Sequence, residues 1–549
     1  MHWADYTAQR LMERGGKQVS ASGITPSGEF HIGHLREILS AEMIHRACLD
    51  AGIESKYIFI VDSMDPLRRV YDFLSPEYES YIGHPLAYIP APGSDGKPSD
   101  GSVTYAEHFL GPFLNALEQI GVRPEVVMNH EAYESGEFAE YIDTAITKKE
   151  EIREIIQEIS GRELADNWFP YNPMGSDGSL DSVTVMGYEK PFVHWIDSLG
   201  VEGRSDIRKG EGKMPWRIDW AARWAIHGIT CEPAGKDHGA AGGSYDTGIP
   251  ICKLLGGEPP DKIVYEWIQL KGMGPMSSST GLTIDPIEAL SLVPPEILRY
   301  VVARSKINRH IEFDTGSALF QTADEYERLV SNPIADDEEM TKRQLVAAQT
   351  QSGAIRLSQV KAGANPSDSV GGVSFRHLSM LAQIKASDAD VWKSLNRSGH
   401  IQGAPRESLV VRLARMRTWI DGPHFPEGAK LEIRRELSDE ARGKLDEGGM
   451  DFLSVLSMLL SECEWGDEQI SEAISNACES AEIPRKKGYA SIYWALIGRS
   501  FGPKASSLLC EMDRESVLSL LEIAYGGKGE DAHHCPTWSC DIHILHPSK

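Results

Sequence analysis

Apolar positions along residues 17–65 change their period twice, and the changes predict a strand, a helix and a second strand. Residues 17–21 are a short strand candidate, and residues 57–61, YIFIV, form a continuous apolar run typical of a parallel strand buried on both faces. Between them, helical spacing over residues 35–51 places apolar side chains at Leu35, Ile38, Leu39 and Met43. Gly52 stands just past the end of this helix. The three elements together predict a βαβ unit.

The rest of the chain divides by its pattern into three parts. Residues 66–212 are irregular, with loops rich in Pro, Gly and Asp, and predict an insertion. Regular patterns return at 216–224 and at 263–270, the latter a strand or nearly so. Beyond 330 the chain is predicted to be helical to its end, with a linker or loop at 360–372. One apolar helical face is formed by Ile470, Ala473, Ile474, Ala477, Cys478 and Ala481.

Composition limits the partners and the compartment. The 549 residues carry 55 basic and 81 acidic side chains, a net charge of −26, which argues against a generally basic nucleic-acid coat but leaves room for a local basic groove. The longest apolar runs fall short of the ~18 residues of a membrane helix, and the charged N-terminus lacks a secretion signal. Eight scattered cysteines indicate reduced thiols. We therefore expect a cytoplasmic protein without membrane contact.

Two histidines, His31 and His34, stand three residues apart in the stretch FHIGHLREI, just after a turn-rich run. A strand that ends in such a turn and leads into a helix points backbone N–H groups and the positive end of the helix dipole above the sheet. Gly33 lets a large group approach the backbone, and a polyphosphate is the natural ligand for two imidazoles at this place. The alternative is that the histidines only cap the helix.

A second stretch, GPMSSSTGL at 274–282, forms a small-residue loop after a predicted strand. Its consecutive hydroxyls, Ser277, Ser278 and Ser279, suit a mobile phosphate-binding lid, although a serine-rich loop alone is more often only solvated. Together the two stretches resemble the HIGH and KMSKS signatures of class I aminoacyl-tRNA synthetases.

Further runs in the same order along the chain resemble the class I lysyl-tRNA synthetase family. They are DSMDPLRRV (62–70), YAEHF (105–109), KMPWRIDWAARW (213–224), EPAGKDHGAAGGSYDTG (232–248), PPEILRYVVARSK (294–306), GVSFRHLSMLAQI (372–384) and IYWALIGRSFGPKASSLL (492–509). The resemblance extends from the N-terminus to about residue 525. HIGH alone is shared with nucleotidylyltransferases, whereas the tryptophan-rich run followed by GKDHGAAGGSYDTG is far more specific.

The resemblance implies an α/β Rossmann-type catalytic domain with an inserted subdomain, followed by an all-α C-terminal anticodon-binding domain. We expect the catalytic domain at 1–270, split by an insertion at about 66–212. A connecting region with the KMSKS-like loop follows at 271–330, then the helical domain at 331–526 and a tail at 527–549, which we expect to be disordered. The tail contains histidines and cysteines that could bind zinc.

The resemblance also implies a two-step reaction. Lysine attacks the α-phosphate of ATP to give lysyl-adenylate and pyrophosphate, and the lysyl group then passes to the terminal adenosine of tRNA(Lys). By the same resemblance, catalysis and ATP binding fall to His31, His34, Gly33, Asp237, Met276, Ser277, Ser278 and Ser279, with Mg²⁺ as the companion ion. We expect Asp237 to bind the ATP ribose, as an acidic residue beyond a Rossmann strand often does.

For lysine, the resemblance assigns the pocket to Gly23, Thr25, Trp220, His238 and Tyr265. Aromatic faces suit the aliphatic stem and the ammonium of this substrate, through cation–π contact of roughly 0.5–2 kcal/mol. For Trp220 and Tyr265 the alternative is plain core packing. The ammonium also needs a carboxylate, and the sequence leaves four candidates open: Asp62, Asp65, Glu29 and Glu266.

Two departures from the family change what we expect. Pro275 and Ser278 replace the lysines of KMSKS, so hydroxyl and backbone donors of Ser277–Ser279 must serve, with Mg²⁺ and Lys271 supplying charge. The insertion lacks the cysteines of the zinc knuckle that relatives often carry there, so we predict a metal-free subdomain.

The acidic chain needs local basic stretches to contact tRNA, and the candidates are Arg68-Arg69, Lys148-Lys149 and IPRKKGY (483–489), each of which could equally be a solvated face. We expect a monomer.

Two rival functions are an adenylating enzyme with another amino-acid choice, disfavoured by Trp220, His238 and Tyr265, and a tRNA-binding paralogue that no longer adenylates. Intact His31, His34 and Asp237 argue against the second.

Overall fold

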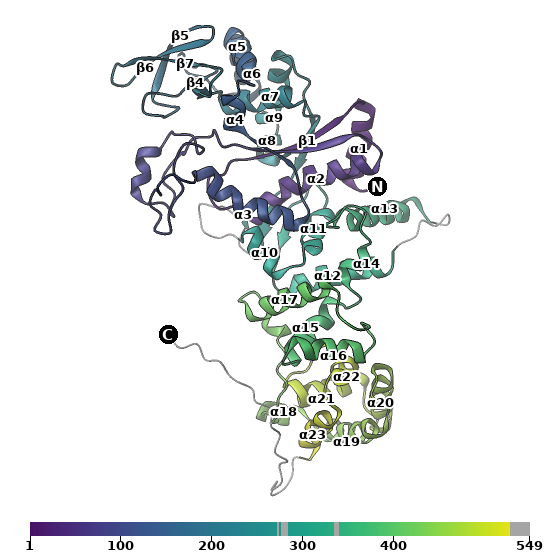
Figure 1. The fold of residues 1–549 in the computed structure, drawn as a ribbon. Coiled ribbons are helices and arrows are strands. Elements are labelled where there is room, and N and C mark those ends of the chain that lie inside the picture. Colours follow the sequence, from purple (N-terminus) through teal and green to yellow (C-terminus); the bar gives the residue numbers. More distant parts are fainter. Residues whose placement is uncertain (272–273, 276–283, 334–339, 527–549) are drawn as a thin grey trace. The chain divides into compact units, whose positions relative to one another are not determined.

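The computed structural model describes residues 1–271, 274–275, 284–333 and 340–526. The chain divides into two compact units (Figure 1). The first comprises Met1–Phe375 and Pro405–Pro426, and the second comprises Arg376–Ala404 and the chain from Glu427 onward.

Five parallel strands form the main sheet of the first unit, in the order β10-β9-β1-β2-β3. Their bounds are β1 Gln18–Ile24, β2 Ser55–Val61, β3 Glu125–Met128, β9 Cys231–Gly235 and β10 Asp261–Tyr265. The order reverses between β1 and β9, and in doubly wound folds ligands bind outside the carboxyl ends of the strands at such a point. The predicted Rossmann-type fold is confirmed. Strand β3 comes from within 66–212, so that range contributes to the main sheet.

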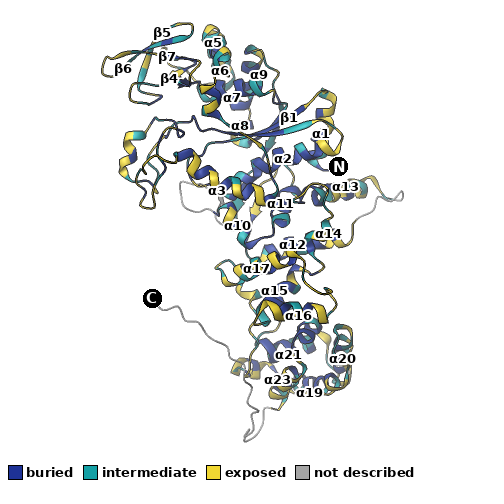
Figure 2. Ribbon diagram, in the orientation of Figure 1, coloured by how far each residue is buried: buried dark blue, intermediate teal, exposed yellow. Residues whose placement is uncertain are grey.

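Helices cover both faces of this sheet (Figure 1). They are α1 Trp3–Arg14, α2 Leu35–Asp50, α3 Tyr105–Ile120, α7 Trp216–His227, α8 Lys236–Gly239 and α9 Ser244–Leu254. Alternate residues of β1 face opposite layers, as the period of a strand requires. Val19 and Ala21 join the core cluster that contains residues of α7 and α9, whereas Ser20 donates to the carbonyl of Ala41 in α2 at 2.8 Å. Figure 2 shows α2 largely in the colour of buried residues.

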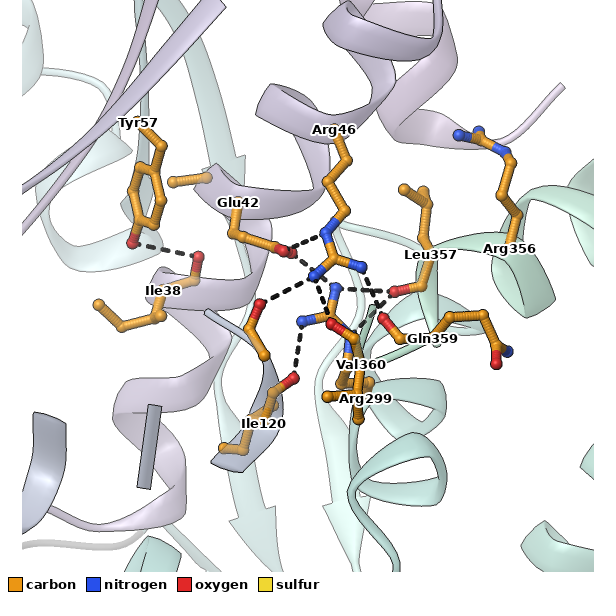
Figure 3. Close-up of polar contacts among 12 residues, drawn as sticks. Ile38, Glu42, Arg46, Tyr57, Ile120, Arg299, Arg356, Leu357, Gln359 and Val360 are labelled. Atoms are coloured by element: carbon orange, nitrogen blue, oxygen red, sulfur yellow. Dashed lines mark hydrogen bonds and ion pairs between the residues drawn. The ribbon is translucent and has the colours of Figure 1, made fainter. Parts of the chain in front are cut away.

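A buried charged cluster fixes α2 to three other helices of the first unit (Figure 3). The carboxylate of Glu42 pairs with Arg46 and with Arg299, the latter at 2.7 Å. The two guanidinium groups also donate to carbonyls at the ends of α3 and α13, among them Ile120 and Leu357. The last carbonyls of a helix have no intrahelical partner and carry partial negative charge, so they compensate the surplus buried cation.

The remainder of 66–212 folds as short helices and small antiparallel sheets. The elements are η2 Pro76–Tyr81, α4 Asn129–Glu134, α5 Ala139–Thr147, α6 Lys149–Ser160, β4 Asn172–Pro173, β5 Val183–Glu189, β6 Phe192–Asp197, β7 Glu202–Asp206 and β8 Gly212–Lys213. Strands β5, β6 and β7 form one sheet. Val193 and Trp195 are buried in it, and the Trp195 indole donates to Ser205 Oγ at 3.0 Å.

The first unit continues through a three-stranded sheet and further helices. These elements are β11 Ile268–Leu270, β12 Gly274–Pro275, β13 Ile311–Phe313, α10 Pro286–Leu292, α11 Pro295–Ala303, α12 Ser317–Ser331, α13 Lys342–Leu357, α14 Pro366–Val370 and α17 Glu407–Asp421. Helix α14 lies inside 360–372, which the sequence predicted as a linker or loop.

The described part of the second unit is helical, apart from its connections. Its helices are α15 Phe375–Ile384, which starts at the unit boundary, α16 Asp388–Arg397, η3 Glu427–Ala429, α18 Asp439–Lys444, α19 Glu447–Glu462, α20 Asp467–Ser480, α21 Arg485–Ile497, α22 Ala505–Glu511 and α23 Arg514–Tyr525. The predicted apolar face of α20 is confirmed, because Ile470, Ala473, Ile474, Ala477 and Cys478 are buried. Throughout the described chain, every helix is too short or too polar to span a bilayer.

Candidate active site

Four parallel strands deliver the candidate residues to one edge of the main sheet. Thr25 follows β1, Asp62 follows β2, Asp237 follows β9, and Tyr265 ends β10. Gly23, near the end of β1, is closely surrounded by its neighbours. A Cβ added there would lie 3.7–3.8 Å from its nearest neighbours, which include Arg223 and Glu232.

His31 and His34 lie side by side before α2, with ring centroids 4.0 Å apart, where residues Ile32–His34 form the 3₁₀ turn η1. Nδ1 of His31 accepts the N–H of Gly33, and Nδ1 of His34 accepts the N–H of His31, each at 3.1 Å. This assigns the ring proton of neutral His31 to Nε2, whereas Nδ1 of His34 also lies 3.2 Å from the carbonyl of His31 and can donate to it in the other tautomer. Burial lowers the pKa of His31 to about 4 and that of His34 to about 3. Near pH 7 each ring is therefore neutral and offers one N–H donor.

The segment that follows the predicted serine loop contacts this turn. Met276 and Ser277–Ser279 lie outside the described residues. Ile284, just beyond the loop, accepts the N–H of Ile32 through its carbonyl at 3.0 Å. The fold therefore brings a residue just beyond the second motif to the first motif. On the other flank, Lys271 pairs with Asp314 at 3.0 Å, so its charge already has a partner.

Glu37 is a site candidate that the sequence analysis missed. It lies on the first turn of α2, where its carboxylate accepts the backbone N–H of Gly23 at 2.8 Å and the hydroxyl of Tyr265 at 2.9 Å. Burial raises the pKa of Glu37 to about 8. Without a cation in contact, this carboxyl is therefore mostly protonated near pH 7. A signal was present in the sequence, because Glu37 follows His34 by almost one helical turn.

Aromatic rings build one wall beside Gly23. Trp220 is only 4% exposed and stacks on Trp216, with ring centroids 5.2 Å apart and planes at 16°. The His238 ring lies 5.7 Å from Trp220 and 5.8 Å from Trp216. Trp216, which the sequence analysis did not select, is the more exposed of the two indoles. Behind them, buried Glu232 accepts the Trp224 indole N–H at 2.6 Å.

A network of buried charges underlies this edge of the sheet. Asp65 pairs with Lys213 at 2.6 Å and accepts the Thr25 hydroxyl at 2.8 Å. Arg223 pairs with both Asp62 and Asp219. The network thus holds three carboxylates and two cations. Two further carboxyl groups, Glu37 and Glu232, lie nearby, so carboxyl groups outnumber cationic groups at this edge. This edge favours a cationic ligand.

The outer rim carries the remaining candidates. Asp237 and His238 are both substantially exposed, with 3.6 Å between Asp237 Oδ2 and His238 Nε2. Lys236 pairs with Glu266 at 2.8 Å. Three of the four carboxylates considered for the lysine ammonium, Asp62, Asp65 and Glu266, therefore already hold a cation. The fourth, Glu29, lies on the far side of the HIGH turn, beside Phe30.

A buried arginine ties the two halves of the site together. Arg36 is fully buried and donates to the carbonyls of Glu266, Lys306 and Ile307 at 3.0–3.2 Å. It therefore fixes α2, which carries His34 and Glu37, against the segment that carries Tyr265.

Comparisons with known proteins show what this chain is similar to. The family described as "tRNA synthetases class I (K)" matches residues 1–354. A lysine--tRNA ligase of Archaeoglobus fulgidus is 36% identical over 528 residues, which cover 95% of this chain and 100% of that protein. One from Picrophilus torridus is 35% identical, covering 94% of this chain and 98% of that protein, and lysine--tRNA ligase 1 of Methanosarcina acetivorans is 35% identical, covering 94% and 97%.

Proposed function

From the premise that this chain belongs to the class I lysyl-tRNA synthetases, we propose roles for its individual residues in each step of the reaction. The enzyme activates L-lysine with ATP and transfers it to tRNA(Lys). We propose further that it acts in the cytoplasm as a monomer and that Mg²⁺ enters bound to ATP. Mg²⁺ is usually coordinated by substrate phosphates together with one or two carboxylates, rather than by protein ligands alone, which supports the last point.

The lysine side chain is proposed to extend past Gly23 and Thr25 toward Glu37 and Tyr265. Glu37 has no ionic partner among the described residues, and its raised pKa shows how unfavourable a lone charge is at this place. An ammonium supplies the missing counter-charge, so Glu37 ionises as lysine binds. The indoles of Trp216 and Trp220, with His238, support the aliphatic stem.

The triphosphate is proposed to lie over the HIGH turn. The Nε2–H group of His31, and that of His34 in the matching tautomer, are positioned donors for phosphate oxygens, and Gly33 lets the phosphates approach the backbone. Neutral imidazoles donate without needing a proton from solvent, and preorganised donors of this kind favour the transition state over the ground state. Asp237 is proposed to bind the ribose, and the loop of Met276 and Ser277–Ser279 to close over the phosphates.

In the first step an oxygen of the lysine carboxylate attacks the α-phosphorus, and the bond from that phosphorus to the bridging oxygen of pyrophosphate breaks. In the second step a ribose hydroxyl of the terminal adenosine attacks the carbonyl carbon of lysyl-adenylate. The hydroxyl loses its proton and AMP leaves. The chain's contribution is to hold the reacting groups and to stabilise the added charge on phosphorus.

The observation that carries the amino-acid assignment is the hydrogen-bonded pair of partly buried Glu37 and buried Tyr265, in which Glu37 also accepts the N–H of Gly23. The test is aminoacylation of tRNA(Lys) with lysine, with arginine, and with the lysine analogue that bears a methyl group in place of the ammonium. We expect only lysine to be attached at low micromolar concentrations of enzyme. Efficient attachment of the methyl analogue would contradict the role of Glu37.

A further inference from the structure

An apolar pocket of about 310 Å³ opens on the other side of the HIGH turn, between α3 and the start of α10. Its volume is at the lower end of the range for small-molecule sites, roughly 300–1,000 Å³. The described residues proposed above for lysine and ATP do not line it. Those that do include Glu29, Phe30, His108, Phe109, Phe113 and Asp285.

The pocket is next to the catalytic histidines. The Phe30 ring stacks on Phe113, with centroids 4.2 Å apart and planes at 8°. The same ring meets His34 edge-on at 5.2 Å. One aromatic ring therefore separates the pocket from His34.

A surface formed by Arg69, Tyr71 and Phe73, here called the aromatic platform, leads to this pocket. Phe73 is 39% exposed and its ring is nearly parallel to that of Tyr71, at 5° and 5.7 Å. The Arg69 guanidinium lies 5.3 Å from the Tyr71 ring. Phe73 also meets Phe109, a wall of the pocket, at 5.6 Å. The rings thus form a continuous path from the surface to the pocket.

Within the described chain, the platform combines unpaired basic residues with aromatic rings, whereas the other basic runs hold both paired cations and exposed ones such as Arg485 and Lys486. Lys487 pairs with Asp446 at 2.7 Å, and Lys149 pairs with Glu150 at 3.4 Å. Arg68 and Arg69 are exposed and have no carboxylate partner within the part of the chain that the structure describes. In a protein of net charge −26, two such arginines beside exposed aromatic rings favour a ligand that carries both bases and phosphates.

We infer that the aromatic platform and the pocket bind the unpaired 3′-terminal nucleotides of tRNA, an inference that rests on the proposed function. Single-stranded bases are held mainly by stacking on aromatic rings, with arginines at the phosphates. Glu29 and Asp285 bring carboxylates to the pocket, which disfavour a phosphate there and suit a base and its ribose. Only the Phe30 ring would separate a terminal nucleotide in this pocket from His34.

The first test is Phe73→Ala in the full-length enzyme. The KM for tRNA(Lys) in aminoacylation should rise roughly 5- to 100-fold, which corresponds to one lost stacking contact, while the KM values for ATP and lysine stay unchanged. Phe73→Trp should restore the KM for tRNA. Tyr6→Ala is the matched control, because Tyr6 is an exposed aromatic residue, 59% exposed, on α1 of the same unit.

The second test measures the Kd of two tRNAs, intact tRNA(Lys) and tRNA(Lys) that lacks its unpaired 3′ nucleotides. Each is measured with the wild type, Phe73→Ala and Tyr6→Ala. Truncation should weaken binding to the wild type and to Tyr6→Ala, but not weaken it further for Phe73→Ala, because the contact is lost only once. An unchanged KM for tRNA in Phe73→Ala would overturn the inference. A second result would also overturn the inference: Phe73→Ala raises the KM for ATP, and truncation of the tRNA weakens binding equally in all three proteins. The pocket would then hold the adenine of ATP rather than a tRNA nucleotide.

The proposed function and the role of the aromatic platform can be contradicted independently of each other. A wild-type enzyme that charges no tRNA with lysine contradicts the proposed function. A wild-type enzyme that charges tRNA normally, with Phe73→Ala indistinguishable from it, contradicts only the role of the aromatic platform.

Discussion

At the scale of single residues, burial shifts the pKa values of the groups that we propose contact the substrates. In the ligand-free protein His31 and His34 are neutral donors near pH 7, because burial lowers both pKa values far below neutrality. Glu37 is shifted in the opposite sense, because burial disfavours its anion. Each shift suits the proposed ligand, a polyanion at the histidines and an ammonium at the carboxyl.

Replacing His34 by Asn should lower kcat for adenylate formation by roughly 10²–10³, because one preorganised donor is lost, with little effect on the Kd for lysine. His45→Asn is the control. His45 is another histidine of α2, and its Nδ1 lies 2.9 Å from Ser55 Oγ, away from the site. Single-turnover measurement of adenylate separates the step from product release. Equal rates for the two variants would rule out the donor role of His34.

Replacing Glu37 by Gln should weaken lysine binding by about 2–5 kcal/mol, the usual cost of removing one partner of a buried charge pair. The amide oxygen can still accept one of the two hydrogen bonds, so the fold should be retained. The methyl analogue of lysine serves as the matched ligand, and its Kd should hardly change. Calorimetric titration of both ligands decides the point, and an equal loss for both would assign Glu37 a structural role only.

The raised pKa of Glu37 also predicts a pH dependence. Lysine affinity should increase with pH and level off above about 8, as the free enzyme comes to carry the ionised carboxylate. In the lysine-free protein the native state holds this proton up to about pH 8, whereas an ordinary glutamate releases it near 4.5. The native state therefore binds more protons between these values, and its contribution to stability falls as pH rises.

Glu37→Gln tests that dependence directly. In this variant the slope of lysine affinity between pH 6 and 8, and the matching slope in the free energy of unfolding, should both diminish. Parallel pH profiles for variant and wild type would show that another group titrates.

The sequence predicted the histidine pair but not the buried glutamate, and the reason is physical. His31 and His34 lie within one short motif, and their geometry depends mainly on the turn that contains them. The role of Glu37 depends on Tyr265, which β10 brings to within 2.9 Å across 228 positions of sequence. The spacing of Glu37 from His34 can be read from the sequence, but its contact with Tyr265 cannot.

At the scale of elements, α2 is the part of the fold on which the site depends. One helix carries His34 at its start, Glu37 on its first turn and the buried cluster of Glu42 and Arg46 further along. Arg36 and Arg299 connect this helix to segments that follow the main sheet in the chain. A change in the protein that shifted α2 would therefore move the histidines and Glu37 together.

Arg299→Met tests the cluster as a structural unit. Breaking a buried pair from one side typically costs about 3–5 kcal/mol, and here it also leaves the carbonyls of Ile120 and Leu357 without their donor. Arg304→Met is the control, because the pair of Arg304 with Glu325 is more than one-third exposed and such pairs contribute about 0–1 kcal/mol. Urea unfolding measures both, and equal losses would contradict the account.

Prediction of elements succeeded where each element is continuous and strongly patterned. The helix at Leu35–Asp50 and the strand at Ser55–Val61 lie within two residues of the predicted bounds. Strand β3, Glu125–Met128, lies inside a range predicted as an insertion, because it is a short edge strand whose residues are partly or fully exposed. An edge strand of this kind lacks the continuous apolar run by which β2 was recognised.

At the scale of the whole molecule, we predict that ordinary packing, without a metal ion, holds the insertion together. The sheet of β5, β6 and β7 buries Val193 and Trp195, and its position in the chain is the one where relatives were expected to carry a zinc knuckle. Treatment of the full-length enzyme with a strong chelator should leave the unfolding of the first unit unchanged. A variant ending at residue 526 is the control, because it removes the tail whose histidines and cysteines could bind zinc. Zinc that remains in this variant and whose removal lowers stability would contradict the prediction.

The most direct test of the account is amino-acid-dependent ATP–pyrophosphate exchange by the full-length enzyme, with and without tRNA(Lys), across a panel of amino acids. The account predicts exchange with lysine alone, which would show that neutral histidines and a loop without lysines suffice for adenylation. No exchange with any amino acid, even with tRNA present and bound, would contradict the proposed catalytic roles. Exchange with an uncharged amino acid would contradict the assignment of Glu37 to the ammonium.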